Sequence, residues 1–222
     1  MIVLVGVLAL LTGLTSKFAD LLNEHGFFWH RHAGVISGWV WSLLAVALTL
    51  TDPWVAAMWW ATCLFWFFRC KLDHFNHALA GVGVVVASTV FAVRGEFPFG
   101  PAIGVLLWLS VTSVVQNAAR RRWPHNEALV RFLRLRLRFY AGPAALAVIG
   151  ETWLPVVAIV FGMLGTEIVT VWHGRVAASG QARSWPSGLR YIPAADTGDF
   201  RTSVAPVAPS SPVAVAAERS AV

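Results

Sequence analysis

The chain has 222 residues, of which 57% are hydrophobic and 13% are charged, whereas soluble domains carry roughly 25% charged residues. This composition excludes an ordinary water-soluble domain and predicts a membrane protein whose main solvent is the lipid bilayer. The formal net charge of +6 does not indicate a nucleic-acid partner, because basic residues held on one side of a membrane protein have a simpler cause in its topology.

The first apolar run starts at the amino terminus and covers residues 2–16. It lacks the basic n-region and the small-residue cleavage pattern of a secretory signal. We therefore expect it to be a helix that the protein retains.

Six further apolar runs follow, and the seven together predict an all-α, polytopic transmembrane helical bundle of about seven helices. The runs lie at residues 2–16, 34–50, 53–68, 78–93, 97–115, 139–150 and 153–172. Several are shorter than the roughly 20 residues that a straight span requires, so turns beside them are expected to complete the helices. The short run at 139–150 fits a re-entrant segment as well as a full span.

The distribution of positive charge favours seven helices over six. With seven, the N-terminus lies outside and the C-terminus is cytoplasmic, and of the 17 lysine and arginine residues only Arg94 falls on the outer side. With six, the arginines of the tail would move outside, against the tendency of lysine and arginine to collect in the cytoplasm. We therefore expect a multi-pass protein of the cell membrane.

Two segments differ in composition from the apolar runs. Residues 119–140, ARRRWPHNEALVRFLRLRLRFY, are basic and are interrupted by Pro124, and they predict an interfacial helix whose arginines reach the lipid head groups. From about residue 175 the chain is rich in Pro, Ser, Ala and Val without a helical period. We therefore divide the chain into a transmembrane helical domain at 1–174 and a disordered cytoplasmic tail at 175–222.

The first group of candidate site residues follows the first run, in the segment KFADLLNEHG. If the helix continues through it, Lys17, Asp20 and Glu24 share one face, because they are spaced i, i+3 and i+7. Two carboxylates and a lysine would then point into one cytoplasmic mouth. The alternative is a solvated helix end with an ordinary lysine–aspartate pair.

The second group, RCKLDHFNHALAG, lies at the start of the fourth run. On a helix, Asp73 and His77 are i, i+4 neighbours and His74 and His77 are i, i+3 neighbours, so the three side chains can reach one point. That spacing suits a divalent metal ion or a proton relay. Lys71 and Asn76 add more polar groups than capping needs, although Asp73 alone also fits an ordinary N-cap.

The third group, Gln116, Asn117 and Arg120, lies at the cytoplasmic end of the fifth run. The planar guanidinium of arginine matches phosphate oxygens, and a carboxamide at this position has no part in setting topology. We interpret the three residues as candidate ligands of a phosphorylated head group. Arg121 and Arg122, which follow, are explained by attraction to anionic lipid.

A single carboxylate lies inside the last run. Glu167 falls in the segment GMLGTEIVTVW, at a depth where a charged group is costly, and such residues usually face the interior of the bundle with a partner. We therefore expect Glu167 to face inward and to act in catalysis or in a proton relay.

Tryptophan is frequent, with 12 residues in the chain. Those at the ends of the runs fit interfacial belts. Trp41, Trp66 and several others fall within the runs, where packing is the ordinary explanation. The alternative is an aromatic-lined cavity for a long hydrocarbon, because ring faces also stabilise cationic intermediates.

Together these groups predict a membrane-embedded enzyme that acts from the cytoplasmic side on a polyprenyl, isoprenoid or other lipid (di)phosphate, as a metal-dependent transferase or cyclase. The candidate catalytic residues are Asp20, Glu24, Asp73, His77 and Glu167. The candidate substrate-binding residues are Lys17, Lys71, Asn76, Gln116, Asn117 and Arg120. Mg²⁺ is the expected cofactor, with Asp20, Asp73 and His74 as candidate ligands, because Mg²⁺ commonly bridges carboxylates and substrate phosphates.

Two other functions remain open. A small-solute or proton-coupled transporter would use Glu167 and the histidines as a relay, but the predicted outer loops carry few ionisable groups. A b-type haem protein would pair His74 or His77 with a histidine of another helix. The chain contains no aspartate-rich prenyltransferase motif, histidine-box oxygenase motif, glycine-rich phosphate loop or GxSxG nucleophile, so its motifs do not identify the substrate or the reaction.

Overall fold

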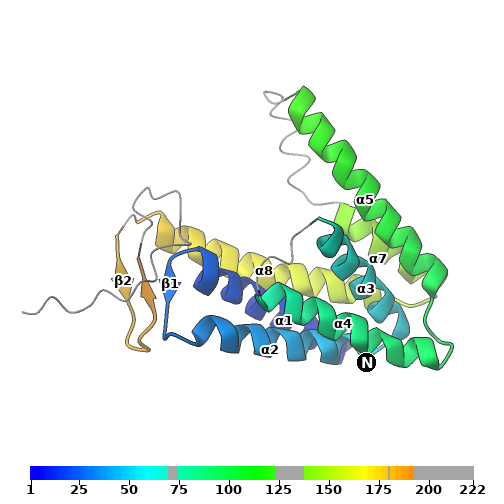
Figure 1. Ribbon diagram of the computed structural model, residues 1–222, viewed down its shortest axis with the longest axis horizontal. Helices are drawn as coiled ribbons and strands as arrows, with labels where there is room; N and C mark the ends of the chain where they lie inside the picture. The colour runs from blue at the N-terminus through cyan, green and yellow to red at the C-terminus, as the bar shows by residue number, and fades with distance from the viewer. Residues whose placement is uncertain (70–74, 124–137, 180, 193–222) are drawn as a thin grey trace, which may run out of the picture.

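The computed structural model describes residues 1–69, 75–123, 138–179 and 181–192, and this part of the chain forms a bundle of seven α-helices (Figure 1). The helices are α1 (Ile2–Glu24), α2 (Ala33–Thr49), α3 (Pro53–Phe68), α4 (Phe75–Val93), α5 (Phe99–Arg122), α7 (Arg138–Ile149) and α8 (Leu154–Ala177). Each predicted run corresponds to one helix, so the predicted all-α bundle is confirmed. The interfacial helix expected between α5 and α7 lies outside the described residues.

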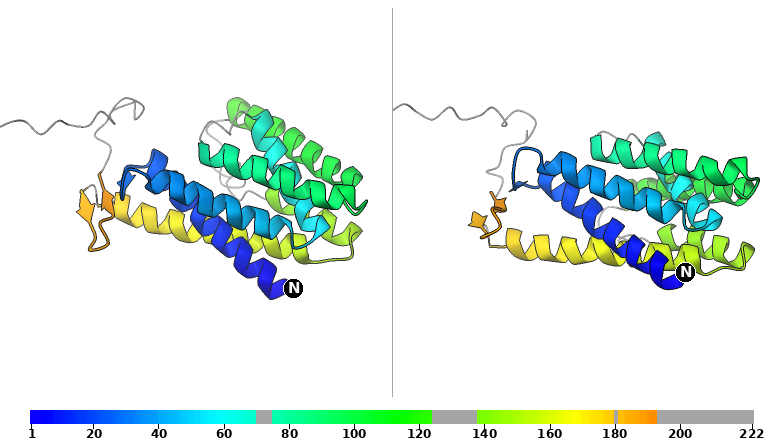
Figure 2. Two further views of the ribbon diagram at one scale, coloured as in Figure 1. Left: turned by 60° about the horizontal axis from the view of Figure 1, so that its bottom comes forward. Right: turned by 90° about the horizontal axis from the view of Figure 1, so that it is seen from below.

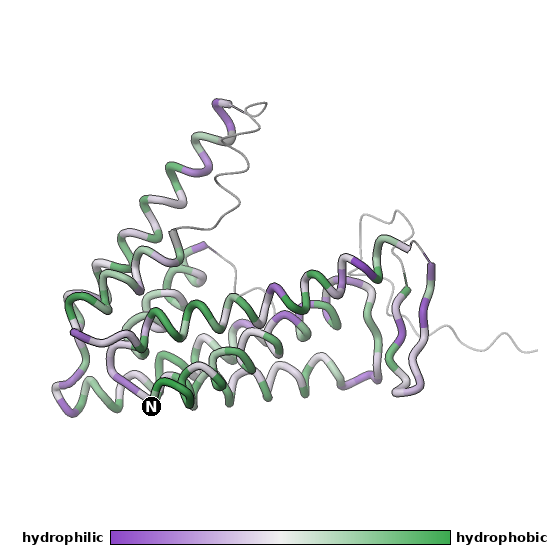
Figure 3. Tube along the Cα trace, turned by 180° about the vertical axis from the view of Figure 1, so that it is seen from behind, coloured by the Kyte–Doolittle hydropathy of each residue, from purple (hydrophilic) through white to green (hydrophobic). Residues whose placement is uncertain are grey.

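Three of the described helices are long and apolar enough to cross a membrane. They are Ile2–Asn23, Phe99–Ala119 and Leu154–Ala177, with mean hydropathies of 2.0, 1.6 and 2.0. Hydrophobic residues extend along the helices, while hydrophilic ones gather toward the ends and in the small sheet (Figure 3). Many large apolar side chains are exposed, among them Val82, Val111 and Val148. A surface of this kind favours lipid over water and supports a membrane protein.

The other four helices are apolar but shorter, and α7 is the shortest. It has 12 residues with Pro143 inside it, and a helix of that length extends only about 18 Å, less than the roughly 30 Å of a bilayer's hydrocarbon core. The described part of α7 is therefore shorter than a full span.

Short connections join several helices at the end of the bundle that carries the N-terminus (Figure 1). The turn into α3 shows why a helix starts there: Asp52 Oδ1 accepts hydrogen bonds from the backbone N–H groups of Trp54 and Val55, at 2.8 and 3.1 Å. Pro53 occupies the first helical position, where its missing N–H is not needed. Helix α2 ends at Thr49, and the aspartate cap followed by proline starts α3 a few residues later.

Helices α1 and α8 touch backbone to backbone. A Cβ atom at Gly13 would collide with the carbonyl oxygen of Gly162, and one at Gly165 would collide with the carbonyl oxygen of Leu10. Small residues permit such close approach in other membrane helix pairs. The crossing brings the first and last helices of the bundle together along much of their length (Figure 2).

The main core lies where α3 meets the neighbouring helices. Its buried members include Val5, Leu48, Met58, Leu109 and Leu146, contributed by α1, α2, α3, α5 and α7. With Ala158 of α8, six of the described helices share one apolar centre, with α3 in its middle.

A three-stranded sheet covers the end of the bundle opposite the N-terminus (Figure 1). Its strands are β1 (Phe27–Phe28), β2 (Arg183–Ser184) and β3 (Arg190–Tyr191), in the antiparallel order β1-β3-β2. The turn into β1 is made by Gly26, which has a φ of +72° and whose carbonyl accepts a hydrogen bond from the Ile192 N–H at 3.0 Å.

The sheet corrects the predicted start of the tail. Residues 175–177 continue α8, and residues 183–191 contain β2 and β3, so the disorder predicted from residue 175 is wrong for this part of the tail. The Phe27 ring explains why this part of the tail is ordered. Its centroid lies 4.9 Å from that of the Tyr191 ring and 5.1 Å from that of the Trp172 ring. Residues 193–222 lie outside the described residues.

We expect Gly13→Leu to destabilise the protein strongly, because the new side chain must push α1 away from α8. Overpacking of this kind costs roughly 1–3 kcal/mol or more. The measurement is thermal unfolding of the detergent-solubilised protein, followed by tryptophan fluorescence. The matched control is Gly104→Leu, since a Cβ at Gly104 has nothing within 4 Å. Equal melting temperatures for the two variants would contradict the close crossing.

Candidate functional site

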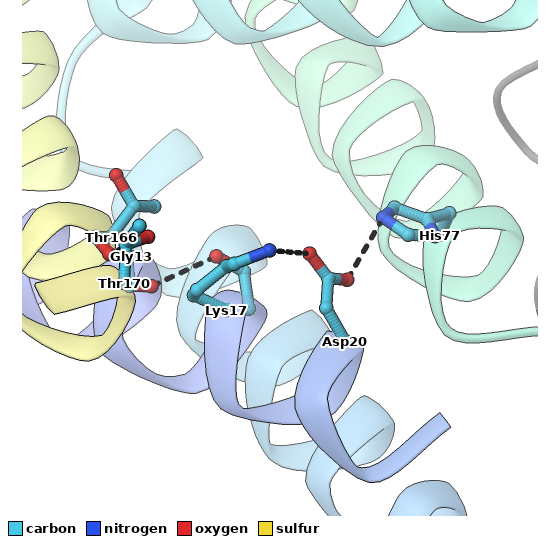
Figure 4. Close-up of polar contacts among 7 residues, drawn as sticks. Gly13, Lys17, Asp20, His77, Thr166 and Thr170 are labelled. Atoms are coloured by element: carbon cyan, nitrogen blue, oxygen red, sulfur yellow. Dashed lines mark hydrogen bonds and ion pairs between the residues drawn. The ribbon is translucent and has the colours of Figure 1, made fainter. Parts of the chain in front are cut away.

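Three ionisable side chains meet where α1 approaches α4 (Figure 4). Lys17 Nζ lies 3.4 Å from Asp20 Oδ2, and His77 Nε2 lies 3.4 Å from Asp20 Oδ1. The two contacts use different oxygens of one carboxylate, so Asp20 connects a lysine of its own helix with a histidine of α4. We call these residues the Lys17–Asp20–His77 cluster.

The local sequence explains the positions of all three residues. Helix α1 continues to Glu24, well past the apolar run, so Lys17 and Asp20 are i, i+3 neighbours on one face, as predicted. His77 lies in the first turn of α4, which begins at Phe75. The N-terminus of a helix carries a partial positive charge, so the Asp20 carboxylate is favourably placed near the start of α4.

Aromatic rings enclose His77 on two sides. The ring centroid of Trp41, from α2, lies 5.1 Å from that of His77, and the centroid of Trp66, from α3, lies 6.4 Å away. Both rings meet the imidazole edge to face, at 84°, an arrangement that aromatic pairs prefer. Trp41 is 3% exposed. Four helices therefore contribute to the surroundings of one histidine.

The cluster is only partly shielded. The side chains of Lys17, Asp20 and His77 are 23%, 24% and 22% exposed. Pairs at this level of exposure contribute at most about 1 kcal/mol each to stability, so the cluster adds little to holding the bundle together. It leaves the Lys17 ammonium partly accessible beside the carboxylate, whereas Nδ1 of His77 is buried and Nε2 contacts Asp20.

This arrangement suits proton transfer next to an anion. A carboxylate in contact with one nitrogen of an imidazole orients the ring and determines which nitrogen carries a proton. The Lys17 ammonium offers a mobile positive charge to a phosphate or carboxylate of a ligand.

Hydroxyl groups line the α1–α8 contact beside the cluster (Figure 4). Each donates to a carbonyl of its own helix: Ser16 to Gly13 at 3.0 Å, Thr166 to Met163 at 2.8 Å and Thr170 to Thr166 at 2.8 Å. Their protons are used within the helices, so we assign these hydroxyls a packing role.

Several predicted site residues cannot be compared with the cluster. Lys71, Asp73 and His74 lie outside the described residues. For Glu24, Asn76 and Arg120 the structure describes the helical backbone alone, at the end of α1, in the first turn of α4 and near the end of α5. Their predicted roles stay predictions.

Gln116 and Asn117 lie in the last two turns of α5. This helix packs chiefly against α3 and α7, and its C-terminal half points away from α1 and α8 (Figure 1). Gln116 is half-buried and Asn117 is exposed. The described contacts place them on a different part of the bundle from Lys17 and Asp20.

Glu167 has a different orientation from the one expected. Its side chain is exposed on α8, while the neighbouring Thr166 faces Gly13 of α1. The glycine contact determines which face of α8 turns inward, and Glu167 is not on it. The expectation that Glu167 faces the interior of the bundle is therefore wrong for the single chain.

Metal ligands were predicted at Asp20, Asp73 and His74, and Asp20 alone has a described side chain. Within the described residues, no three or more His, Cys, Asp or Glu side chains gather closely enough to hold a metal ion. Asp20 supplies hard oxygen atoms, the ligand type that Mg²⁺ prefers, but both of its oxygens already contact Lys17 and His77.

One histidine pair was not predicted as a site. The rings of His25 and His173 stack at 5.2 Å between centroids, with 27° between their planes, and Phe27 and Tyr191 lie against His173. The pair joins the end of α1 to α8. Nothing local signals it, because the two residues are far apart in the sequence.

No protein family model, curated protein or solved structure matches the chain.

We expect a short bis-maleimide reagent to cross-link Asp20→Cys with His77→Cys, in a background that also carries Cys63→Ala and Cys70→Ala. The reason is the direct contact between the two native side chains. Loss of free thiols and an internally linked peptide in mass spectrometry would measure it. The control is Glu96→Cys with His77→Cys, since Glu96 follows the far end of α4 at Val93, about 24 Å along the helix from His77. Equal linking of both pairs would contradict the described cluster.

Proposed function

We propose that the protein is a multi-pass enzyme of the cell membrane that acts on an isoprenoid or other lipid (di)phosphate. The observation that carries the proposal is the Lys17–Asp20–His77 cluster, in which an ammonium and an imidazole flank one carboxylate inside an apolar bundle. An amphiphile with an anionic head group matches both halves of this environment. The nearby indoles of Trp41 and Trp66 suit the start of a hydrocarbon chain.

The proposal includes a cytoplasmic location for the cluster. Lys17 and Arg69 lie toward one end of their helices, whereas Arg94 lies in the connection between α4 and α5, at the end with the N-terminus. Positively charged residues collect on the cytoplasmic side of membrane proteins. Seven crossings with the N-terminus outside account for this division.

Each member of the cluster has a proposed role. Lys17 neutralises a phosphate oxygen of the substrate, and His77 transfers a proton to or from the reacting group. Asp20 orients His77 in the free enzyme. We retain Asp73 and Glu24 as proposed catalytic groups, and Lys71 and Asn76 as proposed contacts to the head group. The proposal gives no role at the cluster to Glu167, on the exposed face of α8, or to the residues near the end of α5, Gln116, Asn117 and Arg120.

Asp20→Asn and His77→Gln should each lower turnover by about a hundredfold, a typical contribution of general acid–base catalysis. The measurement is the consumption of farnesyl diphosphate and of phosphatidic acid by the protein in liposomes, followed by mass spectrometry. Glu96→Gln is the matched control, because it changes an exposed carboxylate in the connection after α4. Full turnover by Asp20→Asn would remove the cluster from the mechanism.

The same preparation separates the other two functions. Proton or solute flux across the liposome membrane, without any change in the lipids, would favour a transporter. An absorbance band at about 410–430 nm in the purified protein would favour a b-type haem; these wavelengths are typical of haem bound by histidine.

The proposed cofactor is Mg²⁺, which Asp20 would hold and which would offset the negative charge of the substrate's phosphate group. We expect chelation of divalent ions to stop turnover and added Mg²⁺ to restore it, because a hard cation offsets charge on a (di)phosphate. A shift of tryptophan fluorescence on Mg²⁺ titration, lost in Asp20→Asn and kept in Glu96→Gln, would give a second readout. Full turnover in excess chelator would refute the requirement for Mg²⁺.

A further inference from the structure

An apolar groove lies between α3 and α4, outside the main core. It has a volume of about 170 Å³ and is lined by Cys63, Leu64, Phe67, Gly81, Val82, Val85 and Val86. Almost all of its lining is carbon surface. Phe67, Val82 and Val86 are about 60% exposed, so the groove opens on the outer surface of the bundle. We call it the α3–α4 groove.

The groove begins one helical turn from the cluster. Gly81 is the i+4 neighbour of His77 on α4, and Cys63 is the i−3 neighbour of Trp66 on α3. Residues with these spacings lie on the same side of a helix, about 5–6 Å apart. The lining residues Gly81 and Cys63 therefore lie about one turn along α4 and α3 from His77 and Trp66, toward the middle of the two helices.

Gly81 is among the residues that line the groove. Val85 and Cys63 form deeper parts of the wall, since Cys63 is 3% exposed and Val85 is half-buried. The exposed members of the wall face the side where the proposed bilayer lies. A groove of this kind admits a flexible hydrocarbon directly from lipid, whereas it offers a polar ligand no hydrogen-bond partner.

We propose that the α3–α4 groove holds the single isoprenyl chain of a lipid phosphate whose head group lies at the Lys17–Asp20–His77 cluster. The inference rests on the proposed function and adds where the chain lies and how it enters. A single narrow groove accommodates one chain, and a diacyl phospholipid carries two. The positive charge of Lys17 at one end and the carbon surface at the other match the two ends of such a molecule.

The test uses farnesyl phosphate that carries a photoreactive diazirine at the end of its chain. After irradiation of the full-length protein in liposomes, mass spectrometry maps the labelled residues. We expect label in 63–67 and 81–86, and we expect unlabelled farnesyl phosphate to compete with it. A phosphatidic acid probe with the same diazirine should label these segments at least severalfold less. Equal or stronger labelling by phosphatidic acid would overturn the single-chain assignment.

Two variants narrow the groove in different ways. Gly81→Leu fills its floor, and Val82→Trp covers its exposed edge without changing a buried position. Competed labelling is the part of the labelling that unlabelled farnesyl phosphate suppresses. Each variant should lower it by about tenfold, because a chain displaced from the groove loses contact over several methylene groups. The control, Gly104→Leu, places the same side chain on open α5 surface and should label like the unaltered protein. Thermal unfolding shows whether each variant is folded. If Gly81→Leu does not fold, the labelling of Val82→Trp tests the groove.

The outcomes distinguish the two proposals. Competed labelling that depends on Lys17 but maps to another pair of helices would overturn the groove and leave the proposed function standing. No competed labelling at all would overturn both. Labelling of the groove that is unchanged in Lys17→Met would overturn the placement of the head group.

Discussion

The backbone contact of α1 with α8 is the constraint on which the candidate site depends. At Gly13, Gly162 and Gly165 the two helices lie so close that neither can rotate about its axis without a collision. Lys17 is the i+4 neighbour of Gly13, and Asp20 lies one turn further along α1. Fixing the rotation of α1 at Gly13 therefore fixes the direction in which the lysine and the aspartate point. A close backbone contact at glycines thus determines the geometry of the polar cluster.

The side chains that form and surround the Lys17–Asp20–His77 cluster come from four helices. Asp20 comes from α1, His77 from α4, and the flanking indoles of Trp41 and Trp66 from α2 and α3. The carboxylate and the imidazole remain partly accessible while aromatic carbon limits the water around them. A group that exchanges protons with a bound amphiphile needs both conditions, since full burial would block access and full exposure would weaken electrostatic interactions.

The sequence predicted what depends on local spacing. Seven apolar runs were enough for seven helices, and the i, i+3 spacing placed Lys17 and Asp20 on one face. The contact between Asp20 and His77 depends on packing between helices, which spacing does not encode. Glu167 was predicted to face inward because a charged group in lipid is costly. The glycines, however, determine which face of α8 turns toward α1. Strands as short as β2 and β3 have no period that a sequence pattern can reveal.

The contact between α1 and α8 and the pairing of β1 with β3 affect how the protein assembles during synthesis. Helix α1 is synthesised before its principal neighbour α8 and before β3, the strand that pairs with β1. Until α8 is made, α1 has α2 as its main helical neighbour. The described bundle is therefore complete only after residue 192 has been synthesised, so a nascent chain stalled before α8 would leave Gly13 and its polar neighbours without the helix that covers them.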